Sequence, residues 1–126
     1  MITTTSQVLH DGVRNVVMQF SGRSDGSGSE TNVVKVDASE LVPPADAGLK
    51  IKIIDYDVQG GTVTLSWAAD DPVPFAILGV GGVFDYCRTG GMRNGGGDTA
   101  NGDILLSTDG FELGSSYTIT LDMVKT

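Results

Sequence analysis

The sequence predicts an all-β protein, an antiparallel β-sandwich with a jelly-roll-like arrangement of about eight strands. Apolar and polar residues alternate with a period of two in several short segments, which is typical of strands with one buried face. Clusters of Gly, Pro, Ser and Asp separate these segments at intervals of roughly ten residues, the spacing of a sandwich or barrel. No long segment shows a helical period.

The chain of 126 residues has the length of one domain. We expect residues 13–126 to form a single β-sandwich domain that carries a Gly-rich loop at 79–102. Residues 1–12 are rich in Thr and Ser and lack apolar periodicity, so we expect them to form a flexible N-terminal arm. The expected strands cover 13–20, 31–37, 49–53, 62–67, 74–78, 83–87, 104–106 and 116–124.

The first expected strand, 13–20, alternates apolar and polar residues, and the polar segment 21–30 then forms a loop. The second strand, 31–37, is followed by residues 38–41, which have the composition of a single helical turn. Pro43 and Pro44 prevent this turn from extending into a helix.

The third and fourth strands, 49–53 and 62–67, are expected to form a hairpin. Gln59, Gly60 and Gly61 lie between them, and glycine adopts the positive φ angles that hairpin turns require. In three of the alternating strands the apolar residues occupy every second position and so face the same side of the sheet. The expected core consists of these residues: Leu49, Ile51, Ile53, Val63, Leu65, Trp67, Ile119, Leu121 and Met123.

Prolines accompany the next two strands, 74–78 and 83–87, so we expect them near a sheet edge. Residues 104–106 form a short apolar seventh strand. The last strand, 116–124, alternates without interruption and is therefore the clearest strand of the chain.

The composition excludes several classes of partner. Sixteen acidic against eight basic residues leave a net charge of −8, which opposes binding to a phosphate backbone. Apolar runs are too short to cross a membrane, and the N-terminus lacks the charged and apolar regions of a secretory signal. The single cysteine, Cys87, rules out an internal disulfide and fits assembly in a reducing cytoplasm. We therefore expect neither a nucleic-acid nor a membrane partner.

No motif indicates an enzyme. His10 lies in the expected arm, far along the chain from Cys87, and a Cys/His dyad needs both groups on a rigid frame. A cysteine at a strand end is most often a small core residue, although Arg88 could lower the pKa of this thiol. We expect no catalytic residues and no cofactor.

Three carboxylate pairs are candidates for glycoside hydrolysis, but the chain has few aromatic residues to line a sugar cleft. These pairs are Asp55 with Asp57, Asp70 with Asp71, and Asp98 with Asp103. Two loops, 25–30 and 98–103, have oxygen ligands at spacings that suggest calcium. Neither matches the twelve-residue EF-hand pattern, and Asp, Asn, Ser and Gly are also ordinary turn residues. We expect no bound metal, although both loops stay open as calcium sites.

The Gly-rich loop resembles a phosphate-binding loop, but it leads into a strand instead of a helix. A contact with a neighbouring chain suits it better, because small residues allow close backbone approach and Arg and Met are enriched at interfaces. The alternative is a mobile loop without a partner. The expected partner-binding residues come from this loop and from the arm: Thr3, Thr4, Thr5, Arg88, Met92, Arg93 and Asn94.

Six segments together resemble a group of small virion proteins of tailed bacteriophages that look like capsid decoration (cement) proteins. The segments are DGVRN at 11–15, DGSGSET at 25–31, VDASEL at 36–41, LSWAA at 65–69, GDILLST at 102–108 and YTITL at 117–121. The resemblance covers nearly the whole chain, and its motifs are structural.

The resemblance implies a β-rich structural protein that assembles in the host cytoplasm and resides on the capsid surface of the virion. Its expected partners are the major capsid protein and further copies of itself, as a dimer or trimer. Such a protein would bind the outer shell and stabilise it. The alternative function is a tail- or fibre-associated β-sandwich module that binds carbohydrate.

Overall fold

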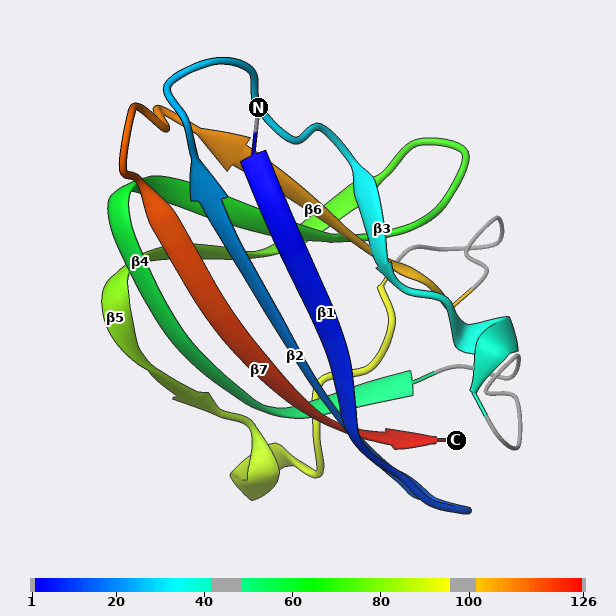
Figure 1. Ribbon diagram of the computed structural model, residues 1–126. Coiled ribbons are helices and arrows are strands. Elements are labelled where there is room, and N and C mark those ends of the chain that lie inside the picture. The colour runs from blue at the N-terminus through cyan, green and yellow to red at the C-terminus, as the bar shows by residue number, and fades with distance from the viewer. Residues whose placement is uncertain (1, 42–48, 96–101, 126) are drawn as a thin grey trace.

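The computed structural model describes residues 2–41, 49–95 and 102–125, and these form one antiparallel sheet (Figure 1). The described strands are β1 (Ile2–Asp11), β2 (Asn15–Ser24), β3 (Val33–Val36), β4 (Leu49–Trp67), β5 (Val73–Asp85), β6 (Ile104–Asp109) and β7 (Ser116–Lys125). Two 3-10 turns, η1 (Ala38–Glu40) and η2 (Cys87–Thr89), are the helical elements of this part of the chain, and η1 confirms the expected turn. No helix in the described ranges is long and apolar enough to span a membrane.

Six of the seven strands follow the order β1-β2-β7-β4-β6-β3, and the seventh, β5, pairs with β4 beside this path. The strongly bent sheet nearly closes into a barrel (Figure 1). The all-β antiparallel class is therefore confirmed. The finer sandwich and jelly-roll arrangement is not confirmed, because the described strands form one continuous sheet.

Strand β4 is a single long strand that bends at its centre. The prediction of a hairpin between residues 49–53 and 62–67 is therefore wrong. The first half of β4 pairs with β7, from Leu49 to Gln59, while its second half pairs with β6, from Thr62 to Trp67. Gly60, with a φ of +85°, lies where the strand leaves one partner and meets the other. The glycines thus bend a single strand of 19 residues, because each half has a different partner from a distant part of the chain.

Strand β5 follows the bend of β4, and the two expected strands at 74–78 and 83–87 are one strand here. The register with β4 shifts between Val58 and Thr62, opposite Gly79 and Val80. The prediction of a loop is consequently wrong for residues 79–85, whose backbone pairs with β4. Eight expected strands become seven because two pairs merge and the N-terminal segment adds one.

That N-terminal segment is strand β1, so the expectation of a flexible arm is wrong for residues Ile2–Asp11. The strand pairs with β2 from Ile2 opposite Ser24 to Asp11 opposite Val16. Nearly all its side chains are exposed, since β1 lies at the edge of the sheet. Backbone hydrogen bonds hold it there, and these leave no apolar pattern in the sequence.

The core is confirmed at eight of the nine expected positions, and Ile53 is the exception. The register between β4 and β7 shifts between Ile51 and Ile53, which is a β-bulge. The bulge changes the parity of the strand, so Ile54 is fully buried while Ile53 is half-buried. Trp67 is 1% exposed and stacks on Phe75 with 4.2 Å between ring centroids.

Candidate interaction surfaces

The longest regular free edge of the sheet is β1. Its inner side pairs with β2, and no strand of the described residues pairs with its other side. The sequence from Ile2 to Leu9 contains neither a charged residue nor a proline. Edge strands that must stay unpaired usually carry Lys, Pro or bulges, and the one bulge of β1 lies near its end, between Val8 and His10. This edge is therefore suited to pair with another chain.

The other two edges are less suitable. Strand β3 has only four residues. Strand β5 is longer, but Pro74 and two register shifts interrupt its pairing with β4. Val80, in the middle of β5, has a φ of +64°, which distorts the edge further. Among the described strands, β1 thus presents the most regular row of backbone donors and acceptors.

A seam separates β1 from β3, because the sheet does not close there (Figure 1). A hollow of about 440 Å³ lies in this seam. Its apolar lining includes Val8 and Val34, each about half exposed, with the buried Met18 beneath. The seam therefore exposes apolar surface beside the free edge of β1.

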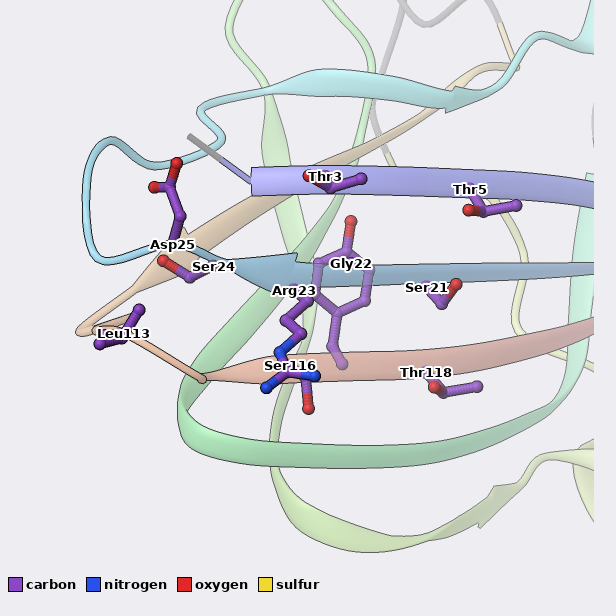
Figure 2. Close-up of a pocket in the computed structure, with 11 residues that line it drawn as sticks. Thr3, Thr5, Ser21, Gly22, Arg23, Ser24, Asp25, Leu113, Ser116 and Thr118 are labelled. Atoms are coloured by element: carbon purple, nitrogen blue, oxygen red, sulfur yellow. The ribbon is translucent and has the colours of Figure 1, made fainter.

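Hydroxyl groups dominate the outer face of the same region, which Figure 2 shows. A hollow of about 660 Å³ spreads over β1, β2 and β7. Thr5, Ser21 and Thr118 lie in one row across the three strands, since Thr5 pairs with Ser21 and Ser21 with Thr118. Arg23 and Asp25 are the charged residues of this lining. The surface presents many small polar groups on a rigid sheet.

The expected partner-binding residues of the Gly-rich segment lie elsewhere. Arg88 belongs to η2 and is exposed, as is Arg93. Met92 pairs with Ile51 through two backbone hydrogen bonds of 2.7 and 2.9 Å, and its half-buried side chain packs against the core. Asn94 is half-buried as well. Residues 96–101 of the expected loop lie outside the described residues.

The structure does not bring the two expected groups together. Thr3, with Thr4 and Thr5 beside it, pairs with Arg23 on β2. The segment after β5 lies in the same row across the sheet as His10, at the other end of β1. Thr3 and His10 are seven positions apart along the strand, a distance of about 24 Å. The predicted residues thus belong to two distinct surfaces.

Cys87 is exposed, so the interpretation as a core residue is wrong. The pKa of the Cys87 thiol is raised above its ordinary value of 9.0. The largest cause is a hydrogen bond with Asp85, and the next is partial desolvation. His10 lies on β1, and Cys87 follows β5 with β2, β7 and β4 in between, which corresponds to about 19 Å at the usual strand spacing. The two residues are therefore not arranged as a catalytic dyad.

The carboxylates considered for glycoside hydrolysis are either exposed or hydrogen-bonded to neighbouring residues. Asp55 and Asp57 are exposed on β4, and Asp57 accepts a hydrogen bond of 2.7 Å from Gln59. Asp103 accepts one of 2.9 Å from the backbone N–H of Ala38. The partner in its pair, Asp98, and most of the loop 98–103 lie outside the described residues. In the described ranges no group of His, Cys, Asp and Glu is arranged to hold a metal.

Glu30, the last residue of the other calcium candidate, faces the interior. Its carboxylate lies 2.8 Å from the ammonium of Lys35 and accepts a hydrogen bond from the hydroxyl of Tyr117. Both charged side chains are almost fully buried. The sequence carries no sign of this cluster, since polar residues in a loop between strands have no pattern that distinguishes an inward from an outward side chain.

All eight aromatic side chains lie within the described residues, and none is exposed. Phe20, Trp67 and Tyr117 are buried, and the remaining five are half-buried. Sugar-binding surfaces commonly present an open aromatic ring, which this protein lacks.

In comparisons with protein-family models, curated proteins and solved structures, nothing matches this chain. The geometry of its surfaces therefore carries the functional argument.

Proposed function

We propose that this protein is a structural, non-enzymatic virion protein that decorates a bacteriophage capsid, binds its outer shell and stabilises it. The observation that carries this proposal is the free edge of β1, with eight uncharged residues from Ile2 to Leu9 and no proline. The proposed partners are the major capsid protein and other copies of this chain, as a dimer or trimer.

The edge supports attachment because an added strand gains a continuous row of backbone hydrogen bonds. The uncharged edge also lets an acidic protein approach a partner without strong repulsion. Val8 and Leu9, which are 49% and 48% exposed, add apolar contact area near the seam. The resemblance of six sequence segments to phage decoration proteins supports the identity of the partner.

The second candidate is a tail- or fibre-associated module that binds carbohydrate. The hydroxyl-rich hollow across β1, β2 and β7 favours it, since Arg23, Asp25 and several hydroxyls could bind sugar hydroxyls (Figure 2). The lack of an exposed aromatic ring weighs against it. Saturable binding to a defined glycan on an array would favour this candidate over capsid decoration.

The decisive experiment is purification of phage heads followed by detection of the protein and a density map of the particle. We expect the protein in stoichiometric amounts above the outer shell. Abundant protein in infected cells with none in purified particles would overturn the proposal.

The role of β1 is tested with two matched variants, Thr5→Lys and Thr118→Lys. Both residues are exposed and lie in the same row of the outer face, but only Thr5 is on the edge strand. A lysine on the edge opposes strand addition, so we expect Thr5→Lys to lower shell occupancy several-fold and Thr118→Lys to leave it unchanged. A loss of shell occupancy with Thr118→Lys but not with Thr5→Lys would show that the protein attaches through the outer face instead.

A further inference from the structure

Basic residues gather at one end of this acidic protein. A hollow of about 400 Å³ lies on the outer side of the sheet, where β4 begins and β7 ends. Arg14, Lys50 and Lys52 line it, together with Asn15, Cys87, Gly90 and Val124. Arg88 follows Cys87 directly in η2. Half of the eight basic residues of the chain thus lie in or beside a single hollow.

The fold holds these side chains in place. Val124 on β7 pairs with Lys50 on one side and with Asn15 on the other, which brings three strands to the hollow. The carbonyl of Lys52 accepts a hydrogen bond of 2.7 Å from the backbone N–H of Tyr86. The two lysine side chains are half-buried, so their stems pack on the protein while their ammonium groups reach solvent.

These basic residues lack an ion pair within the described part of the chain. Lys125, close by, is paired with Asp11 at 2.6 Å, and Lys35 is paired with Glu30 at 2.8 Å. Two carboxylates act on residues of this cluster from outside the lining. Asp85 interacts with Arg88 and Lys52, and Asp122 acts on Cys87. Four cations against two carboxylates leave a local excess of positive charge in a protein of net charge −8.

We infer that this hollow, lined by Arg14, Lys50 and Lys52 beside Arg88, docks a short acidic segment of a partner protein. Charge complementarity identifies the occupant, because two or three carboxylates would neutralise the local excess. A long polyanion such as nucleic acid fits poorly, since Asp55 and Asp57 extend the outer face of β4 with negative charge. The inference goes beyond the proposed virion role and does not depend on it.

The test uses the whole protein and a fluorescently labelled peptide of six glutamates, with binding measured by anisotropy at low and at physiological salt. We expect weak binding that salt reduces, because exposed ion pairs are screened. The double variant Lys50→Gln/Lys52→Gln should weaken binding about tenfold. Two single variants, Lys52→Gln and Arg23→Gln, change the net charge equally, but Arg23 lies far from the hollow. Only Lys52→Gln should weaken binding measurably.

Three outcomes would overturn the inference. The peptide does not bind at low salt; Arg23→Gln weakens binding as much as Lys52→Gln; or a single-stranded oligonucleotide or inorganic phosphate binds more tightly with the same dependence on Lys50 and Lys52. Because the assay contains no phage particle, its failure leaves the capsid proposal standing, and an absence from purified heads leaves this inference standing.

Discussion

The phenolic hydroxyl of Tyr117 on β7 donates a hydrogen bond to the carboxylate of Glu30, which lies 87 positions earlier in the chain. Lys35 on β3 binds the other carboxylate oxygen at 2.8 Å, and the hydroxyl of Thr108 accepts a hydrogen bond of 3.0 Å from the backbone N–H of Glu30. The cluster therefore connects β3 and the preceding loop to β6 and β7. It fixes the short edge strand β3, which has few other partners.

Removal of one member should destabilise the protein strongly. We expect Glu30→Gln to lower the free energy of unfolding by about 3–5 kcal/mol, because it leaves the ammonium of Lys35 buried without a counter-ion. Tyr117→Phe should cost about 1.5–3 kcal/mol, the usual contribution of a hydrogen bond to a charged group. Urea unfolding measures both. A cost below 1 kcal/mol for Glu30→Gln would contradict the buried ion pair.

The same cluster predicts a pH dependence. The pKa of Tyr117 is raised well above its ordinary value of 10.0. Burial of the hydroxyl is the largest cause, and the hydrogen bond to Glu30 is the next. The folded protein therefore keeps a proton that the unfolded chain loses. This contribution to stability is complete below pH 10 and is lost as the pH rises above it, with a slope of up to about 1.4 kcal/mol per pH unit. In denaturant titrations between pH 9 and 11, Tyr117→Phe should show a shallower decline than the wild type. Identical slopes would contradict the prediction.

The bend of β4 predicts a difference between two glycines. A Cβ at Gly60 would lie 2.5 Å from the hydroxyl of Ser115, and the φ of +85° strains any other residue. At Gly79 the nearest atom would be 3.7 Å away, and its φ lies outside the left-handed region. We expect Gly60→Ala to lower the free energy of unfolding by about 1–3 kcal/mol and Gly79→Ala to change it little. Equal effects would show that the bend tolerates a side chain.

Trp67 anchors the second half of β4. Trp67→Ala should cost about 3–5 kcal/mol in urea unfolding, because it opens a cavity next to Phe75. Ile77→Ala is the control, since Ile77 is 68% exposed and should change stability by less than about 0.5 kcal/mol. Similar losses for both variants would contradict the buried position of Trp67.

Cys87 should react slowly with alkylating agents at neutral pH despite its exposure. Asp85 raises the pKa of the thiol, so the thiolate forms only at alkaline pH. Asp85→Asn removes the negative charge and should increase the alkylation rate at pH 7.5 severalfold. A rate that stays constant, or decreases, in this variant would show that Asp85 does not control the thiol.

Part of the fold could be predicted from the sequence because a strand with one buried face leaves a local pattern. The alternation at Val16, Met18 and Phe20 indicated β2, and that at 116–124 indicated β7. The one helical turn before Pro43 and Pro44 was predictable from local composition, because the two prolines prevent a longer helix. In each alternating strand the apolar residues are the buried ones. The core could therefore be predicted from the sequence, with Ile53 as the exception.

The candidate surfaces were less predictable. Strand β1 is held by backbone pairing and exposes its side chains, so the parity of residues 2–11 carried no signal of a strand. The hollow brings Arg14 beside Lys50 and Lys52, which lie more than thirty positions later in the chain. The edge exists only once β1 has paired with its neighbour β2, and the hollow exists only once β2 and β4 have both paired with the distant strand β7.

What the sequence by itself determined is the all-β class, the faces of its alternating strands and the acidic charge, since each depends on the order of neighbouring residues. Only the tertiary structure decided whether a glycine pair turns or bends the chain. Gln59, Gly60 and Gly61 permit a hairpin locally, but β7 pairs with the residues before them and β6 with the residues after them. The strand therefore continues through the glycines, because the hydrogen bonds to two distant partners outweigh the local preference for a turn.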